Sequence, residues 1–120
     1  MKLDILAFGA HPDDVELGAG GILATHAAAG KNVGIVDLTR GEMGTRGTPE
    51  LRDAEAAEAA KILGCVVREN LCMPDGRVGY DHESQLLVAK MVRKYQPDIV
   101  IMNAPTDRHP DHGRGSRLVE

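Results

Sequence analysis

The chain has 120 residues, a length that fits one domain with a modest hydrophobic core. Its formal net charge is -4 and its 14 Lys and Arg residues are scattered, so it lacks the clustered positive charge that follows a nucleic-acid backbone. With no Trp, one Phe and two Tyr it also lacks the aromatic side chains that stack on bases. No apolar stretch approaches the ~20 residues that span a membrane.

The N-terminus and the cysteines predict a cytoplasmic protein. The first apolar run is interrupted by Asp4 and is shorter than the core of a signal peptide. Cys65 and Cys72 do not have CxxC spacing, and they fit reduced, structural thiols better than a disulfide framework.

Strand and helix patterns alternate along the chain. In order, they predict a strand at 3–8, a helix at 17–29, a strand at 33–38, a helix at 49–63, a strand at 65–71, a helix at 82–95 and a strand at 98–102. The signals at the helix ends are local ones. Thr48 is an N-cap residue followed by Pro49, Gly64 ends the same helix, and Pro97 follows the last helix.

This alternation predicts an α/β fold, a Rossmann-like doubly wound sheet of parallel strands. The commonest strand order, 3-2-1-4, makes the first and fourth strands neighbours and opens a crevice at their carboxyl ends. The two loops richest in His and Asp leave those ends: "GAHPDD" at 9–14 and "NAPTDRHPDHG" at 103–113. We therefore expect the two loops to meet.

Together the loops offer imidazoles and carboxylates, the ligands that zinc takes in catalytic sites. His11, Asp14 and His112 could supply three ligands and leave one position open for water. The simpler alternatives are that Asp13 or Asp14 caps the following helix, and that each histidine is a surface residue. The convergence of both loops on one crevice favours the metal site.

"AHPDD" after the first strand, followed about a hundred residues later by "HPDH", resembles the LmbE/PIG-L-like family of zinc-dependent N-deacetylases, which act on N-acetylglucosamine derivatives. "DLTRGEMGTRGTPELR", "RENLCMPDGR" and "DRHPDHGRGSRLV" are most similar to the deacetylases of bacillithiol biosynthesis. The resemblance implies Zn²⁺ on His11, Asp14 and His112. It also implies that Asp13 is the general base that takes a proton from the attacking water, and that His109 stabilises the oxyanion.

The resemblance further places Arg52 in the sugar-binding pocket, where the alternative is a solvated residue in the first turn of a helix. Asp75 could accept hydrogen bonds from sugar hydroxyls, and its alternative is an ordinary turn aspartate. Arg108 could meet an acidic aglycone. Asp111 stands between the two histidines in the sequence and is a candidate hydrogen-bond partner that fixes the tautomer of one of their imidazoles.

The expected function is zinc-dependent hydrolysis of the N-acetyl group of an N-acetylglucosamine conjugate, with N-acetylglucosaminyl malate as the substrate that the resemblance suggests. Two alternatives stay open. Two histidines and one carboxylate also form the facial triad of non-haem iron oxygenases, so Fe²⁺ is a possible metal. The chain could also be a metal- or sugar-binding half-domain that needs a partner segment.

Three expectations concern the rest of the architecture. The family is about twice as long as this chain, so residues 1–120 are expected to be the N-terminal Rossmann-like part of one domain, with the apolar strand at 98–102 covered by a further segment. The Gly-rich loop "RGEMGTRG" is suited to closing over substrate, and the glycines at 18–21 are expected to let a helix pack closely on the sheet. Family members often form homo-oligomers, which we expect here.

Overall fold

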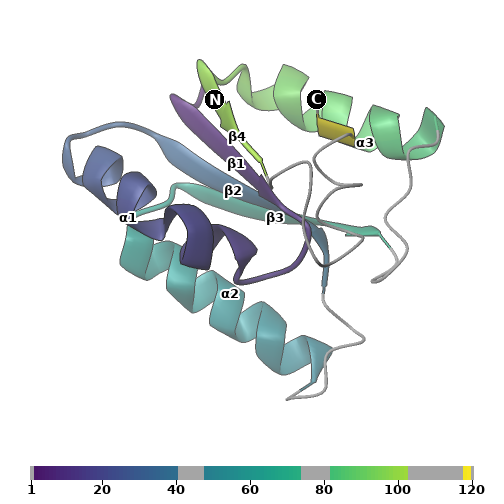
Figure 1. Cartoon of the computed structure of the whole chain (residues 1–120), viewed down its shortest axis with the longest axis horizontal. Coiled ribbons are helices and arrows are strands. Elements are labelled where there is room, and N and C mark those ends of the chain that lie inside the picture. Colours follow the sequence, from purple (N-terminus) through teal and green to yellow (C-terminus); the bar gives the residue numbers. More distant parts are fainter. Residues whose placement is uncertain (1, 41–47, 74–81, 103–117, 120) are drawn as a thin grey trace.

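The structure, a computed structural model, describes residues 2–40, 48–73, 82–102 and 118–119. The described strands form one parallel sheet in the order β3-β2-β1-β4 (Figure 1). In chain order the elements are β1 (Ile5–Gly9), α1 (Asp14–Ala28), β2 (Val33–Thr39), α2 (Pro49–Leu63), β3 (Val67–Met73), α3 (His82–Tyr95) and β4 (Ile99–Ile101). The predicted fold class and the 3-2-1-4 strand order are confirmed.

Helices cover both faces of the sheet, α1 and α2 on one face and α3 on the other (Figure 1). Successive residues of a strand point to opposite faces of the sheet. Because both faces are covered by helices, β1 is apolar and buried at every position. Ile5 and Ala7 join the hydrophobic cluster that includes Leu23 of α1. Leu6 and Phe8 join the cluster that includes Tyr95 of α3. The sheet therefore separates two cores.

The ends of α2 are those that the sequence predicts. The Thr48 hydroxyl accepts a hydrogen bond from the Leu51 amide at 3.1 Å, and Pro49 occupies the first turn. Gly64 follows the helix in the left-handed region, with φ 82°, where a residue without a Cβ is favoured.

Helix α1 begins at Asp14, three positions before the predicted start at Leu17. Its first turn carries the acidic residues Asp14 and Glu16 directly after "HPD", which made the segment resemble a loop, although the apolar i, i+4, i+8 spacing already begins at Val15. The expectation that the glycines at 18–21 pack α1 on the sheet was wrong. Gly18 and Gly21 face open space, and a Cβ at Gly20 would lie 3.7 Å from Leu63 of α2. The contact with the sheet cluster is made by Val15, Ala19 and Leu23.

Among the described strands, β4 lies at an edge of the sheet and pairs only with β1, in the register Ile5 to Ile99. The side of β4 is partly open, since Ile99 is 53% exposed. In the described part of the chain, no helix has the length and hydrophobicity that a membrane crossing requires.

Candidate functional site

The loop that leaves β1 is held tightly against β2. Thr39, at the end of β2, is fully buried and donates both its backbone N–H and its hydroxyl to the Ala10 carbonyl, each at 3.0 Å. Gly9 permits a close approach from the other side, because a Cβ there would lie 2.9 Å from Val15 Cγ2 and 3.3 Å from the Asp14 Cβ. The chain can thus turn from strand to helix within a few residues.

Within this turn the side chains of His11 and Asp14 face each other. His11 Nδ1 lies 3.5 Å from Asp14 Oδ2, and both side chains are 12% exposed. The same Asp14 oxygen accepts a hydrogen bond from the His11 backbone N–H at 2.9 Å, while the Asp14 N–H donates to the His11 carbonyl at 3.2 Å. The two potential ligands are therefore oriented by the turn itself.

Asp13 occupies the N-cap position of α1, but its side chain makes no capping hydrogen bond. Its φ of 87° places it in the left-handed region, a strained conformation for a residue with a side chain. Loss of hydration raises the pKa of its carboxyl, and the neighbouring carboxylates of Asp14 and Glu16 raise it further, while Arg52 acts in the opposite direction. The simple interpretation of Asp13 as a helix-capping side chain is therefore wrong.

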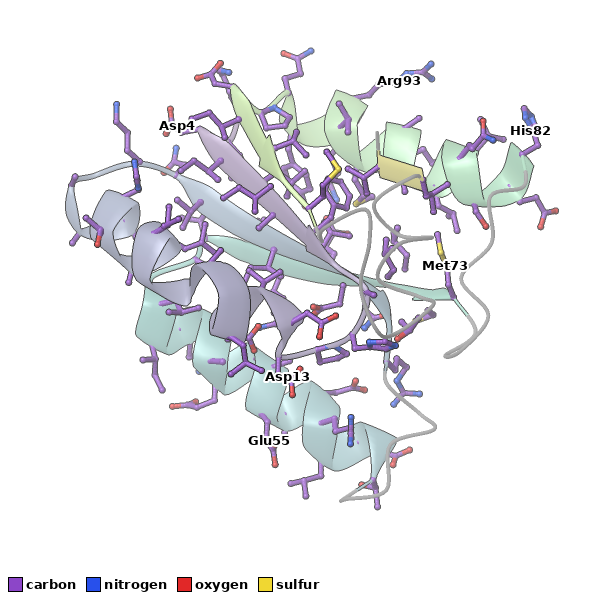
Figure 2. The ribbon with its side chains drawn as sticks, in the orientation of Figure 1. Asp4, Asp13, Glu55, Met73, His82 and Arg93 are labelled. Carbon is purple, nitrogen blue, oxygen red and sulfur yellow. The ribbon has the colours of Figure 1, made fainter. Side chains whose placement is uncertain are left out.

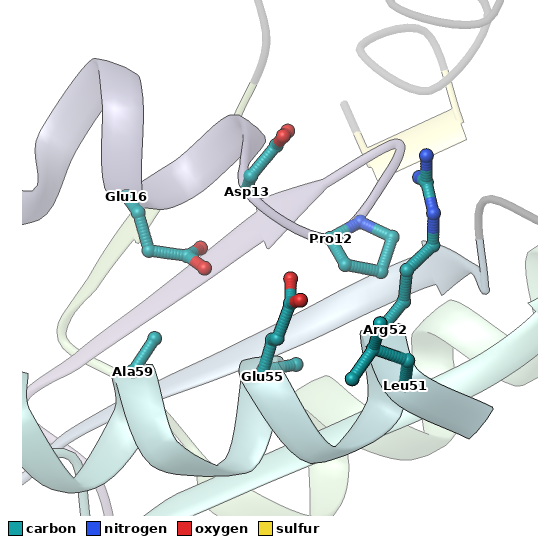
Figure 3. Close-up of a pocket in the computed structure, with 8 residues that line it drawn as sticks. Pro12, Asp13, Glu16, Leu51, Arg52, Glu55 and Ala59 are labelled. Carbon is teal, nitrogen blue, oxygen red and sulfur yellow. The ribbon is translucent and has the colours of Figure 1, made fainter. Parts of the chain in front are cut away.

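A cavity of about 660 Å³ lies between the start of α1 and the first half of α2 (Figure 3). One wall is made by Pro12, Asp13 and Glu16. The other wall comes from α2 and consists of Leu51, Arg52, Glu55, Ala56 and Ala59. Asp13 and Asp4 lie at opposite ends of β1, and the cavity is at the Asp13 end (Figure 2). This is the carboxyl end of the strands, where open α/β sheets bind ligands.

Behind the cavity lies a buried charge cluster that our sequence reasoning missed. Arg68 of β3 pairs with Asp37 of β2 and with Glu16 of α1. Burial raises the pKa of Asp37 to about 6, although the Arg68 guanidinium opposes the shift. The sequence did contain a signal for this cluster: Asp37 and Arg68 each lie inside a predicted strand. Because a buried charge requires a partner of opposite charge, the two residues could have been predicted to pair.

The described residues bring together four of the predicted site residues at one end of the sheet: His11, Asp13, Asp14 and Arg52. The other five predicted residues, Asp75, Arg108, His109, Asp111 and His112, lie outside the described residues, as does most of the Gly-rich loop, 41–47. Within the described ranges, no three His, Cys, Asp or Glu side chains gather closely enough to hold a metal ion. The predicted contact between the two loops stays a prediction.

The chemistry of His11 and Asp14 fits a divalent zinc ion. An imidazole nitrogen and a carboxylate oxygen are both zinc ligands, and two donors about 2.1 Å from a tetrahedral ion lie roughly 3.4 Å apart. The observed separation of 3.5 Å between His11 Nδ1 and Asp14 Oδ2 matches that spacing. These two side chains would form one part of a ligand set.

Comparison with known proteins finds one family. The sequence profile of the family described as PIG-L, GlcNAc-PI de-N-acetylase, matches residues 6–120. Among curated relatives, the uncharacterized deacetylase YaiS of Escherichia coli is 40% identical over 114 residues, which cover 90% of this chain and 61% of that protein.

Solved structures give the same picture of the fold. A conserved protein of Thermus thermophilus is 51% identical with a TM-score of 0.92, covering 97% of this chain and 53% of that one. The N,N'-diacetylchitobiose deacetylase of Pyrococcus horikoshii is 32% identical with a TM-score of 0.88, over 95% of this chain and 46% of that one. GalB, the 4-carboxy-2-hydroxymuconate hydratase of Pseudomonas putida, is 30% identical with a TM-score of 0.88, over 99% and 54%. The chain thus spans about half the length of these proteins.

Proposed function

The chain belongs to the GlcNAc-PI de-N-acetylase (PIG-L) family, and from that premise we propose that its protein hydrolyses the N-acetyl amide of an N-acetylglucosamine conjugate, releasing acetate and a free amine. The observation that carries the proposal is the position of Asp13. Its carboxylate makes no capping bond, lines the cavity and directly precedes Asp14, which faces His11.

We propose that His11 and Asp14, together with His112, hold a zinc ion. The chemistry that zinc supplies in such sites is a lower pKa for water, about 7, and polarisation of a carbonyl group. The 3.5 Å separation of the His11 and Asp14 donor atoms supports this assignment.

Asp13 is the proposed general base. It is exposed on the cavity wall, and its backbone strain points to a functional reason for placing this carboxylate there rather than in a capping bond. In the reaction it takes a proton from water as the water oxygen attacks the acetamide carbonyl carbon, and the proton then passes to the departing amine. His109 donates a hydrogen bond to the oxyanion in this proposal, and Asp111 orients one of the neighbouring imidazoles.

Arg52 is the proposed substrate-binding residue. It lies on α2 across the cavity from Asp13 (Figure 3), and its planar fork of donors suits sugar hydroxyls or a carboxylate. Asp75 and Arg108 are proposed to complete the contacts with the sugar and its aglycone. N-acetylglucosaminyl malate, the substrate of bacillithiol biosynthesis, would present a carboxylate to Arg52 or Arg108, and this makes it the first substrate to test.

The test is amine release by the zinc-loaded protein from N-acetylglucosaminyl malate, N,N'-diacetylchitobiose and a GlcNAc-inositol. Asp13→Asn should lower kcat by ~10²- to 10⁴-fold because a positioned base is lost, while zinc content by elemental analysis stays at the wild-type level. His112→Ala should lose the zinc. Asp98→Asn, an exposed carboxylate paired with Lys2, is the matched control and should keep full activity.

Wild-type amine release by Asp13→Asn would contradict the general-base role. Failure of the wild-type protein to act on all three conjugates would contradict the substrate class.

A second candidate reaction is the addition of water to a carbon–carbon double bond, the type of reaction that the name of the Pseudomonas putida hydratase indicates. A base that activates water serves both reactions. Turnover of an unsaturated dicarboxylate, with no amine release from any of the three conjugates, would favour hydration.

The place of this chain in its protein is also a proposal. We propose that residues 1–120 are the N-terminal Rossmann-like part of one deacetylase domain, because the chain covers only 61%, 53% and 46% of the three relatives YaiS, the Thermus thermophilus protein and the Pyrococcus horikoshii deacetylase. The cytoplasmic location and the homo-oligomeric state stay predictions.

A further inference from the structure

The side chain of Arg68 crosses the face of the sheet beneath α1 and α2 and binds both helices. Its Nε donates to Asp37 Oδ2 at 2.8 Å and its Nη2 to Asp37 Oδ1 at 3.0 Å. Nη2 also donates to Glu16 Oε1 at 3.1 Å, and Nη1 lies 3.1 Å from Glu16 Oε2. Nη1 donates in addition to the Ala56 carbonyl of α2 at 3.2 Å. One guanidinium thus joins β2, β3, α1 and α2.

This cluster is too buried to be an ordinary surface ion pair. The Arg68 side chain is 7% exposed, that of Asp37 2% and that of Glu16 21%. Removing such charges from water is costly, and buried ion pairs can often be replaced by apolar residues of similar volume without loss of stability. What the guanidinium adds is orientation, because its planar fork fixes the direction of each carboxylate that it binds.

The groups that Arg68 orients belong to the two walls of the cavity. Glu16 lies in the first turn of α1, three residues after Asp13, and itself lines the cavity. Ala56 lies one helical turn after Arg52 on α2 and also lines it. The spacing between the proposed general base and the proposed substrate-binding arginine therefore depends on contacts that meet at Arg68.

We propose that Arg68 is a positioning residue for this cavity, holding the first turn of α1, and with it Asp13, at a set distance from α2. The expected effect of Arg68 on kcat rests on the proposed function. The effect of Arg68 on the position of α1 can be measured without any substrate.

The test compares Arg68→Lys with the wild-type protein and with Lys94→Gln. Lysine keeps the charge but cannot bind two carboxylates and a carbonyl with one planar fork. Lys94 contacts Glu69, the strand neighbour of Arg68, at 3.2 Å from the α3 side of the sheet, so its removal breaks an ion pair to the same strand without touching α1.

Amide hydrogen exchange is the first readout. In Arg68→Lys the amide of Leu17, which donates to the Asp13 carbonyl at 2.9 Å, and the amides of the next turn of α1 should exchange about tenfold faster or more, while those of α3 stay at wild-type rates. Lys94→Gln should leave the start of α1 unchanged. Wild-type exchange there in Arg68→Lys, or equal acceleration in both variants, would overturn the proposal.

The second readout is the kinetics of amine release, measured well below the melting temperature. Arg68→Lys should lower kcat by about ten- to a hundredfold, because small misplacement of reacting groups has effects of that size, and it should lower kcat more than it changes KM. A loss of activity that only follows the unfolded fraction would assign Arg68 to folding alone and overturn the proposal. Absence of activity in the wild-type protein would count against the proposed function, and hydrogen exchange would then decide the role of Arg68 by itself.

Discussion

The two faces of the sheet are built differently. On the α3 face the buried residues form an apolar cluster that includes Leu6, Val36 and Tyr95. On the face of α1 and α2, an apolar cluster around Ile35 and Leu23 adjoins two buried charges, Asp37, two residues further along β2, and Arg68, which lies opposite Ile35 in β3. Apolar side chains can pack in several orientations, whereas the hydrogen bonds of a planar guanidinium fix the orientation of the carboxylates that it binds. The difference indicates that the α3 face serves stability and that the other face also serves the geometry of the site.

The largest expected effect on stability lies on the α3 face. Leu6 is fully buried, so Leu6→Ala should lower the free energy of unfolding by about 2–5 kcal/mol. Urea denaturation measures this change. Activity per folded molecule should stay close to wild type, because Leu6 points away from the cavity. The matched control is Leu86→Ala on α3, where the leucine is 43% exposed and the expected change is within about 0.5 kcal/mol. A loss below about 1 kcal/mol in Leu6→Ala would contradict this assignment.

The second effect concerns pH on the other face. The folded protein holds the Asp37 proton more tightly than the unfolded chain does, because its pKa is raised from 3.8 to about 6 by burial, with Glu16 and Asp14 adding to the rise and Arg68 opposing it. The contribution of Asp37 to stability is therefore greatest below about pH 4, falls as the pH rises to about 6, and is constant above. The fall amounts to roughly 3 kcal/mol.

Asp37→Asn removes this titration, so the free energy of unfolding of wild type minus that of the variant should fall between pH 4 and pH 6. Denaturation in urea at pH 4, 5, 6 and 7 measures the difference. Leu86→Ala, which removes an exposed side chain that carries no charge, should keep the wild-type slope. Parallel curves for wild type and Asp37→Asn would show that Asp37 titrates alike in both states.

A pair of glycines sharpens the comparison between the faces. A Cβ at Gly34 would lie 2.6 Å from Val67 Cγ2 and 2.8 Å from Leu3 Cδ1, within the packing of the α3 face. Gly34→Ala should therefore cost about 1–3 kcal/mol of stability through overpacking, with little change in kcat. A Cβ at Gly9 would instead press on Val15 and Asp14.

Gly9→Ala should shift the first turn of α1 by a few tenths of an ångström and lower kcat for amine release about tenfold or more. Thermal unfolding and kinetics of both variants provide the measurement. Equal losses of kcat in the two would remove the proposed distinction between the faces.

Local patterns were sufficient for most of the fold. Thr48, Pro49 and Gly64 marked the ends of α2 because capping depends on neighbours within a few residues. The start of α1 was missed because the acidic Asp14 and Glu16 in its first turn resemble a continuation of the polar loop, even though Val15 begins the apolar period. The glycines at 18–21 were misassigned because composition does not show which side of a helix faces the sheet. Of the candidate site, the motif "HPDD" was visible at once, and the structure places His11, Asp13, Asp14 and Arg52 at one end of the sheet.

The sequence by itself determined the order of strands and helices, because each element follows from residue spacing within a short segment, and their alternation along the chain predicted the parallel sheet. It also showed the "HPDD" motif in the loop after β1. Only the tertiary structure decided that Arg68 meets Asp37 and Glu16, which lie 31 and 52 residues away along the chain. It also decided that Asp13 takes a left-handed conformation and turns to the cavity instead of capping its helix. Contacts of this kind depend on strand register and on the distance between packed helices, and the spacing of residues along the chain predicts neither of them.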